Sequence, residues 1–544
     1  MKTIIKIPLL ITIVLLGILT LMSSCNKVTN PLDGTKLVVN YDLINTKLNF
    51  KFYDAATGLL IGSGTELKVK AHIEGEDKDA VIDITGAALD DYGAESNNGF
   101  ITLALNPNGN YKPSKENPVT FTLVATLNGY LTTSKIVSVT DEGNYEYRID
   151  MVNLSNPPQG VSVKFQNNAT TVNSGVVGQT VTVTTDDGNA SVTLKEGTVL
   201  KDKDGNPLSG NVNVMITFFD NHTDESLQAF PGGLTPMVNQ NGNTERGVFY
   251  SAGFVALEIT DNSGKKAAIV EQNTIPLNMN VSDNTYNPET QMNAAAGDEV
   301  PVYSYDPETG EWNYEQSATI GAGSRGLSVS TELTHLSFWN FDWFTPFTCD
   351  EGVTLHVNLN DNVCNCMFVQ GIMRKAVDNT FLRWVGFFAC DGDDVTFTYL
   401  PGGMPVYIDW VNPSCQSFFP EVFPPELDIP DLCEPVTYNI NVSGHDNLST
   451  VIVDFSAYCA SSPDVIIKPS FGAWYRPVNS WCWQYAVMIN GHSEICGVEV
   501  GQEYVVAVYF NGEWYQETVL VDQSQYIYLD IQIPADICDE VFGL

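Results

Sequence analysis

The sequence predicts an all-β protein built from several antiparallel β-sandwich domains in series. Segments such as 119–127 and 145–151 alternate β-branched or aromatic residues with polar ones, the period of strands with one buried face. Asn-Gly and Asp-Gly pairs, for example at 128–129 and 204–205, mark hairpin turns. No long amphipathic helix is predicted, and residues 288–296 would form a short one at most. The 544 residues exceed what one hydrophobic core can cover, so several domains are expected.

Cys25 ends an N-terminal segment that has the pattern of a secretory signal. Lys2 and Lys6 precede an apolar stretch at 7–21, and Ser23-Ser24 stands directly before the cysteine. The alternatives are an ordinary cleaved signal and a membrane-spanning anchor, but the apolar stretch is short for a span. The segment resembles a bacterial lipobox, which implies cleavage before Cys25, lipidation of that residue and anchoring in a membrane.

Changes in composition divide the chain further. Pro157-Pro158 separates two strand-rich regions, and the last 200 or so residues hold nearly all the cysteines. We predict a signal peptide, a tether and four Ig-like β domains, the last two with disulfides. Their bounds are 1–24, 25–36, 37–156, 159–346, 347–435 and 436–544.

Charge and cysteine content limit the possible partners and the compartment. The formal net charge of −39 repels nucleic acid phosphates and anionic head groups. Solubility on a crowded surface explains this charge, and divalent cation binding is the rival explanation. After Cys25 no cysteine occurs until Cys349, and ten then follow, an even number that favours disulfides in an exported chain. Cys364 and Cys366 form a CxC pair, which is not the CxxC knuckle of zinc ribbons.

The first predicted domain carries two short motifs. Asp54, Thr57 and Gly58 form a D-x-x-T-G hairpin sequence, and Gly129-Tyr130 lies late in the domain. The pair resembles the carboxypeptidase-regulatory-like sandwich family. This resemblance implies a structural or binding module and not the peptidase itself.

The second predicted domain contains several motifs in a fixed order. They occupy residues 194–210, 230–234, 251–255, 301–312 and 334–340. Their order is similar to that in the extracellular domain of cartilage intermediate layer protein and in uncharacterised outer-membrane lipoproteins of Bacteroidota. The resemblance supplies no catalytic residue.

The last two predicted domains have the pattern of a duplication. Cys390 and Cys433 are separated by nearly the same interval as Cys496 and Cys538, and each pair ends in a similar Ile-Pro phrase. We expect these cysteines to occupy equivalent places in the two copies. The disulfide connectivity stays open, because ten cysteines allow many pairings.

Candidate metal ligands are few. His222, Glu225 and His356 have a spacing reminiscent of zinc carboxypeptidases, but the strand-rich context gives them no reason to converge. His335, beside an aromatic block, is expected to be a structural residue. Four aspartates in Asp-rich turns suit a hard cation such as Ca²⁺, with plain hairpin turns as the favoured alternative. They are Asp202, Asp204, Asp391 and Asp393.

An aromatic cluster in the last domain is the strongest binding candidate. Trp474, Tyr475, Trp481 and Trp483 could stack on sugar rings, with Arg476 hydrogen-bonding hydroxyl groups. The alternative, which we favour, is that these side chains fill a thin core and shield a disulfide.

The sequence therefore predicts a non-enzymatic lipoprotein with no required cofactor. The expected role is a structural or protein-interaction subunit of the envelope, the alternative is a glycan-binding accessory protein, and a metal-dependent hydrolase is less favoured. We expect it on the outer membrane, facing outward. Residues 26–30 lack the acidic run often found in surface-exported lipoproteins, so a periplasmic orientation stays open. A stalk is expected, with the cysteine-rich domains farthest from Cys25.

Overall fold

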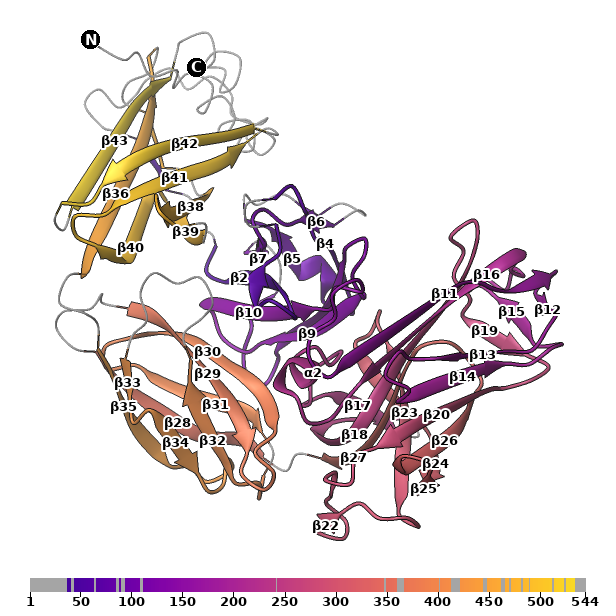
Figure 1. The fold of residues 1–544 in the computed structure, drawn as a ribbon. Coiled ribbons are helices and arrows are strands. Elements are labelled where there is room, and N and C mark those ends of the chain that lie inside the picture. The colour runs from indigo at the N-terminus through magenta and orange to yellow at the C-terminus, as the bar shows by residue number, and fades with distance from the viewer. Residues whose placement is uncertain are drawn as a thin grey trace.

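The computed structural model describes most of the chain after residue 36. The described residues are 37–40, 44–62, 65–84, 88–89, 93–107, 111–240, 242–346, 349–359, 366–400, 402–411, 421–443, 448–460, 465–468, 471–480, 483–488, 490–510, 513–522 and 525–533. They form four β-sandwich domains, at 44–156, 159–346, 349–443 and 448–533, which confirms the predicted all-β class (Figure 1). Cys25, the signal peptide and the tether lie outside the described residues.

The first domain packs two sheets around one core. One sheet has the order β10(Asn144–Met151)-β2(Lys47–Asp54)-β7(Phe100–Leu105)-β5(Val81–Asp83), with β3(Leu59–Leu60) beside β2. The other is β6(Ala94–Glu95)-β4(Lys70–Glu74)-β8(Val119–Thr126)-β9(Thr133–Val139), and η1 spans Lys78–Ala80. Phe50, Phe52 and Phe121 fill the space between the sheets, because alternate residues of each strand face inward.

The second domain is larger. Its ten-stranded sheet has the order β17(Met237–Gln240)-β24(Glu311–Thr319)-β23(Glu299–Asp306)-β27(Phe338–Pro346)-β18(Asn243–Asp261)-β16(Gly210–Phe219)-β11(Val161–Asn173)-β12(Val176–Val177)-β15(Val199–Lys201)-β19(Ile269–Glu271). A second sheet is β13(Val181–Thr184)-β14(Ala190–Leu194)-β20(Ile275–Val281)-β26(Gly326–Leu333)-β25(Gly321–Gly323). The short helix α2 spans Asp224–Gln228, and β21(Tyr286–Asn287) pairs with β22(Met292–Asn293) where the sequence suggested a short helix.

The third and fourth domains each have two sheets. Those of the third are β31(Asp394–Leu400)-β28(Cys349–Leu359)-β35(Thr437–Ser443)-β33(Glu421–Phe423) and β30(Phe381–Cys390)-β29(Cys366–Lys375)-β32(Val406–Trp410)-β34(Glu426–Ile429). In the fourth, β36(Leu448–Cys459) pairs with β37(Val465–Lys468), β40(His492–Glu499) and β43(Gln525–Ile533). Its other sheet is β39(Gln484–Met488)-β38(Phe471–Pro477)-β41(Glu503–Phe510)-β42(Glu513–Leu520).

The first, third and fourth domains share one topology. In each, the first strand lies in the sheet between an antiparallel neighbour and the last strand, which runs parallel to it: β2 with β10, β28 with β35, and β36 with β43. The sequence predicted antiparallel sandwiches, and most strand pairs are antiparallel, but each of these three domains also contains one parallel pair. Because β35 completes the sheet of the third domain, the predicted boundary at residue 435 is one strand too early.

The expected equivalence of the cysteines is wrong. Cys390 ends β30, whereas Cys496 lies within β40, whose counterpart in the third domain is β31. A better marker of the repeat is a cross-strand histidine–aspartate pair. His356 faces Asp394 in one domain and Asp454 faces His492 in the other, both 38 residues apart, with the two residue types exchanged.

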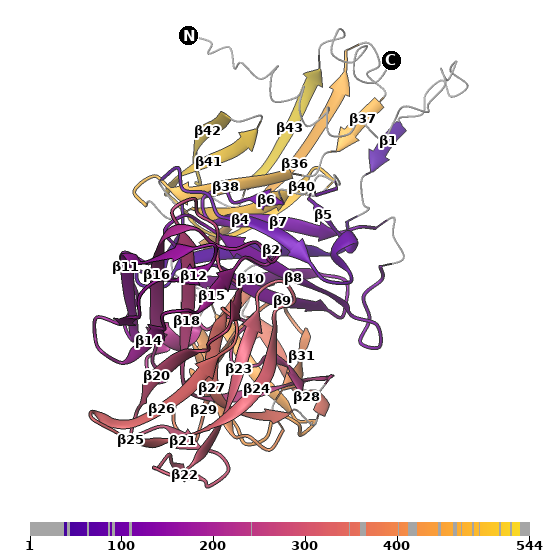
Figure 2. The same cartoon turned by 90° about the vertical axis from the view of Figure 1, so that its right-hand side faces the viewer.

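The predicted stalk is also wrong. β1(Leu37–Asn40), which follows the predicted tether, pairs in parallel with β37 of the fourth domain and is not part of the first (Figure 2). The described chain therefore begins beside the domain that ends it. None of the described helices is long and apolar enough to span a membrane.

The motif residues of the first two domains have structural roles, as turn hydrogen bonds in the first domain and as core contacts in the second. Asp54 Oδ1 accepts hydrogen bonds from the Ala56 and Thr57 amides at 3.1 and 3.0 Å, and the Tyr130 hydroxyl donates to Asp54 Oδ2 at 2.8 Å. In the second domain, Trp312 packs 5.3 Å from Phe230 and 4.8 Å from Tyr305, measured between ring centroids. The separated motifs thus meet in one aromatic core.

We expect Asp54→Ala to destabilise the 54–60 hairpin by about 1–3 kcal/mol, because the turn amides and the Tyr130 hydroxyl lose their acceptor. Hydrogen exchange at Ala56 and Thr57 should accelerate accordingly. Asp204→Ala, in the exposed turn of another hairpin, is the control and should leave these amides unchanged. Unaltered exchange in Asp54→Ala would contradict this role.

Candidate functional site

Two aromatic residues of the candidate glycan-binding cluster, Trp474 and Tyr475, are buried. Trp474 is 7% exposed and packs with Tyr53, Leu60 and Phe100 of the first domain. Tyr475, its neighbour on β38, faces the opposite way into the core of the fourth domain and is 8% exposed. Neither ring offers a face for sugar stacking. The first domain covers Trp474 and the fourth domain's own core covers Tyr475, so these two residues fit the structural alternative that the sequence favoured over glycan binding.

Arg476 and Trp483 have local structural roles. Arg476 Nη1 donates to the carbonyls of Pro477, Val478 and Ser480 at 3.2, 3.2 and 2.6 Å, and its guanidinium lies 4.9 Å from the Trp483 ring centroid. This arrangement closes the loop after β38, and Trp483 packs against the Trp474 cluster. Trp481 lies outside the described residues.

A buried cation–aromatic stack joins three domains. The guanidinium of Arg148, on β10, lies 3.9 Å from the ring centroid of Tyr53 and 4.3 Å from that of Trp384 in the third domain. Asp150, two positions along the same face of β10, accepts from Arg148 Nε at 2.9 Å and from Nη2 at 2.7 Å. Burial opposes the guanidinium charge, but Asp150 outweighs it and raises the pKa of Arg148.

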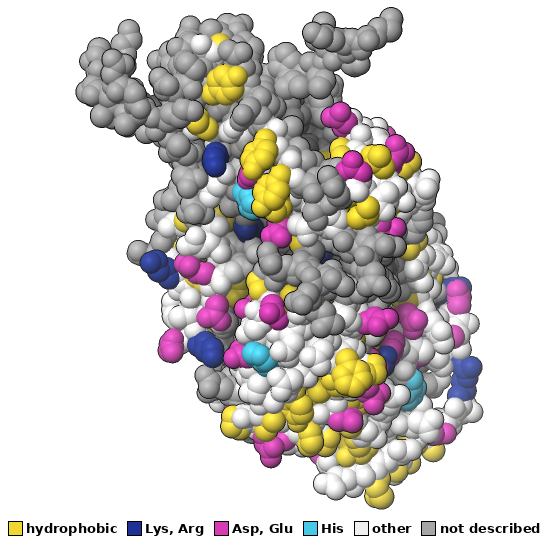
Figure 3. Space-filling model, turned by 90° about the vertical axis from the view of Figure 1, so that its left-hand side faces the viewer, with side chains coloured by type: hydrophobic (Ala, Val, Ile, Leu, Met, Phe, Trp, Pro, Cys, Tyr) yellow, Lys and Arg dark blue, Asp and Glu magenta, His cyan; other side chains and the backbone are white. Residues whose placement is uncertain are grey.

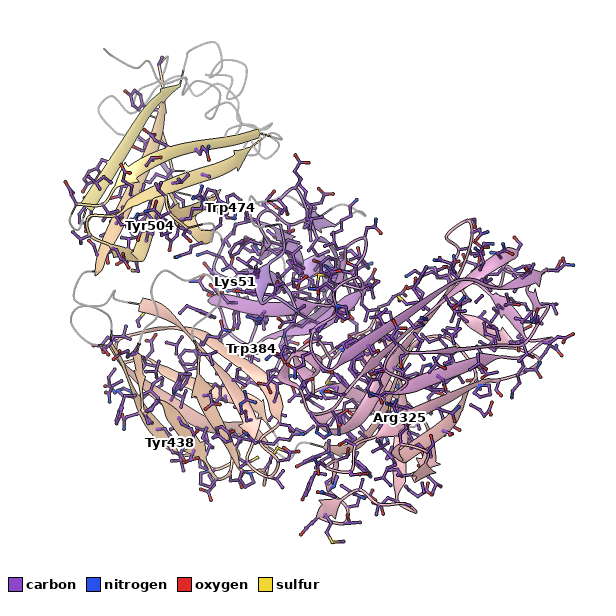
Figure 4. The ribbon with its side chains drawn as sticks, viewed as in Figure 1. Lys51, Arg325, Trp384, Tyr438, Trp474 and Tyr504 are labelled. Atoms are coloured by element: carbon purple, nitrogen blue, oxygen red, sulfur yellow. The ribbon has the colours of Figure 1, made fainter. Side chains whose placement is uncertain are left out.

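The stack leads to the fourth domain, because Tyr53 and Trp474 belong to the same buried cluster. Figure 4 shows Trp474, Lys51 and Trp384 following one another where the fourth, first and third domains meet. Lys51 forms an ion pair with Glu146 and lies 4.9 Å from the ring centroid of Phe368. These contacts make the first domain the hub of the molecule.

Other cations lie close to the same junction. Burial and the neighbouring Arg383 lower the pKa of Lys135 to about 8. Arg374 of the third domain reaches the second, donating from Nη1 to Asp224 Oδ1 at 2.8 Å and from Nε to Asp409 Oδ2 at 3.0 Å. A bidentate arginine–carboxylate pair fixes orientation as well as distance.

Asp342 is a buried carboxylate between the second and third domains. It is fully buried on β27, where the Ala252 amide donates to its Oδ1 at 3.3 Å. Burial raises its pKa to about 7, although Asn340, Ser251 and Lys375 act to lower it. The Lys375 side chain is itself 4% exposed, 4.6 Å from the Tyr250 ring centroid.

The Asp-rich turns use their carboxylates internally. Asp202 Oδ1 accepts from the Asp204 and Asn206 amides at 3.1 and 2.7 Å. Asp391 Oδ1 accepts from the Leu359 amide at 2.8 Å, and Asp393 Oδ2 from the Cys390 amide at 2.7 Å. Within the described part of the chain, no group of three or more His, Cys, Asp or Glu residues could hold a metal ion.

The histidines considered for zinc do not converge. His356 Nδ1 lies 2.7 Å from Asp394 Oδ1 in the third domain, whereas Glu225 belongs to α2 of the second. His335 packs 4.8 Å from the Trp339 ring centroid and is a half-buried structural residue. Cys390, Cys433 and Cys496 are disulfide-bonded, and the connectivity stays open, as it was from the sequence.

Sequence reasoning missed the most exposed aromatic pair of the fourth domain. Tyr526 and Tyr528 on β43 are 64% and 69% exposed, with ring centroids 6.0 Å apart. The Tyr-Ile-Tyr alternation was a visible signal, since both tyrosines must lie on one face of a strand. The sequence provided no reason to prefer this tyrosine pair to the tryptophans as a binding site, because it does not show which face of the strand is buried.

No protein-family model and no curated protein sequence matches the chain. Solved structures with similar folds include the shaft pilin SpaA of Lactobacillus rhamnosus GG, which aligns with 34% of this chain and 98% of its own at 10% identity and a TM-score of 0.19. The major pilin subunit of Bacillus cereus aligns with 90% of this chain and 99% of its own, at 7% identity and a TM-score of 0.14. The minor pilin of Streptococcus agalactiae aligns with 34% of this chain and 95% of its own, at 10% identity and a TM-score of 0.14. Such values define neither a family nor a function for this chain.

We expect Trp474→Ala to loosen the fourth domain from the first by about 3 kcal/mol, because the substitution leaves a cavity in the shared aromatic cluster. Hydrogen exchange should then increase in β3 and at Phe100, on the opposite side of the contact. Phe165→Ala removes an exposed aromatic ring of the second domain and is the control. Unchanged protection of β3 would show that this contact does not hold the domains together.

Asp342→Asn should stabilise the second domain near neutral pH. An acid whose folded pKa is raised from 3.8 to about 7 binds more protons when folded, so the stability it supports falls as pH rises from about 4 to 7. The variant should gain about 1–3 kcal/mol at pH 7.5, at roughly 1.4 kcal/mol per pKa unit, and lose that pH dependence. Thermal unfolding followed by tryptophan fluorescence reports this directly, because Trp339 and Trp343 share β27. Asp204→Asn is the control, and an unchanged pH profile in Asp342→Asn would disprove the assignment.

Proposed function

We propose that this chain is a lipid-anchored, non-enzymatic interaction protein of the cell envelope, which displays binding surfaces on a rigid body of four β-sandwiches. The lipobox-like sequence before Cys25 supports the anchor. The carrying observation is the Arg148 stack, which ties the first, third and fourth domains together with buried contacts. A rigid body loses little conformational entropy when it binds a partner, which suits a scaffold or adhesive subunit.

The charge of the molecule favours particular partners. The chain has 65 acidic residues against 26 basic ones, and Arg148, Lys51 and Lys375 are largely buried at the domain junctions in ion pairs, so the exposed surface is acidic. Such a surface favours partners that are basic or neutral, and it disfavours nucleic acid and anionic lipid. The hydrolase alternative is disfavoured because His222, Glu225 and His356 form no metal-binding group within the described part of the chain.

The proposal predicts that the mature protein fractionates with membranes and is recovered in cross-linked complexes larger than the monomer. Chemical cross-linking of intact cells, followed by detergent solubilisation and purification of the full chain, measures this. Cys25→Ser removes the lipid attachment site and should shift the protein to the soluble fraction.

A protease added to intact cells tests the outward orientation. Digestion of the wild-type protein is the expected result, and a periplasmic protein of the same host serves as the protected control. Recovery of the lipidated protein only as a monomer would overturn the interaction role. Membrane retention of Cys25→Ser would overturn the lipid anchor.

A further inference from the structure

One face of the fourth domain combines exposed aromatic rings with polar side chains. It is formed by β40, β36 and β43, whose registers place His492, Asp454 and Tyr528 in one row and Glu494, Ile452 and Tyr526 in the next. We call these six residues the outer face. The alternate residues Val451, Val453 and Ile495 face the core instead, so the outer face is directed to solvent.

Core packing does not account for the two tyrosines. Both are more than 60% exposed, and their rings are nearly parallel, with an interplanar angle of 17°. Exposed aromatic pairs of this kind mark interaction sites more often than isolated exposed residues do. Figure 3 shows hydrophobic side chains gathered beside acidic and histidine side chains on the face that the fourth domain turns to the viewer.

The polar residues of the outer face are held in place. His492 Nδ1 lies 2.7 Å from Asp454 Oδ1, which fixes the imidazole ring and leaves Nε2 directed away from the pair. His492 and Glu494 are exposed, and Asp454 is partly exposed. An imidazole nitrogen and two carboxylates next to flat rings provide both donors and acceptors for hydroxyl groups.

We propose that the outer face binds a neutral polysaccharide, whose sugar rings pack on Tyr526 and Tyr528 while its hydroxyl groups bond to His492, Asp454 and Glu494. The electron-rich faces of the tyrosines attract the weakly positive C–H faces of a sugar ring. Two adjacent rings favour a ligand with consecutive sugar units. The carboxylates repel acidic polysaccharides and phosphate groups, so the ligand is uncharged.

This inference goes beyond the proposed interaction role and does not depend on it. Tyrosine is well suited to such a surface, because it offers a large contact area with little loss of side-chain entropy. A second copy of this chain is the competing occupant, since an exposed apolar face can also serve a dimer. The test separates the two.

The experiment is affinity electrophoresis of the purified full chain in gels containing neutral polysaccharides (mannan, dextran, xyloglucan and mixed-linkage glucan) or acidic ones (alginate and polygalacturonate). Retardation by at least one neutral polymer and by neither acidic polymer is expected. Tyr526→Ala with Tyr528→Ala should weaken binding by about tenfold or more, since each stacking contact contributes on the order of 1 kcal/mol. The corresponding Phe variants keep the rings and should keep most of the binding.

Matched controls separate the outer face from general surface effects. Phe165→Ala removes an exposed ring of the second domain and should bind as the wild type does. His492→Ala should lose part of the affinity without changing the far-ultraviolet circular dichroism spectrum. Absence of retardation across the neutral panel, or retardation that survives the double Ala variant, would overturn the proposal. A dimer in sedimentation analysis that the double Ala variant dissociates would assign the face to a second copy instead. Loss of glycan binding would leave the cross-linked complexes unaffected, so the two functional proposals fail separately.

Discussion

The position of Arg148 between Tyr53 and Trp384 determines how the domains are arranged. A guanidinium withdrawn from water is tolerated only with a carboxylate partner and aromatic faces around it, and Asp150 and the two rings supply both. Asp150 and Tyr53 belong to the same domain as Arg148, so the contact that requires docking is the one with Trp384 of the third domain. Tyr53 also shares a buried cluster with Leu60, Phe100 and Trp474, so the fourth domain packs beside the same site. The second domain docks separately, through the Ser134–Tyr305 hydroxyl contact at 2.7 Å and the Arg374–Asp224 ion pair.

Several of the few basic residues make contacts between domains. The sequence has 26 basic residues against 65 acidic ones, and several of the basic ones are used inside domain junctions. Lys51, Lys375 and Arg374 each join their domain to a neighbour through an aromatic ring or a carboxylate. Each of these cations also has a carboxylate partner, so the exposed surface keeps the acidic character that the composition gives it. Such a surface repels phosphate groups and anionic lipid, so we expect the exposed aromatic face to bind neutral ligands.

Local features of the fold could be predicted from the sequence, and contacts between domains could not. Alternation at 145–151 predicted β10, which spans Asn144–Met151, because one buried face is a property of the strand itself. Trp474 and Tyr475 lie on β38, where no strand was predicted from the sequence, and the sequence could not show that another domain covers the tryptophan. The glycan-binding alternative was accordingly attached to rings that are largely buried, while the exposed Tyr526 and Tyr528 were overlooked. The Asp-rich turns were ambiguous for a related reason. An aspartate that accepts hydrogen bonds from the amides of its own turn, as Asp202 does, occurs in the same kind of sequence as an aspartate that binds a cation.

The course of the chain shows why no extended stalk forms. Parallel pairing of first and last strands brings the chain into one end of a sandwich and out at the other, a geometry that would extend a series of domains. The fourth domain instead returns to the first, because Trp474 buries more apolar surface there than an extended chain would allow. Its sheet also includes β1, so the predicted 12-residue tether at 25–36, with a reach of about 40 Å, would hold the fourth domain nearest the membrane. The outer face would then lie close to the anchor, and the polysaccharide it meets would be one that extends down to the bilayer. The second domain, farthest from the fourth in Figure 1, would project outward.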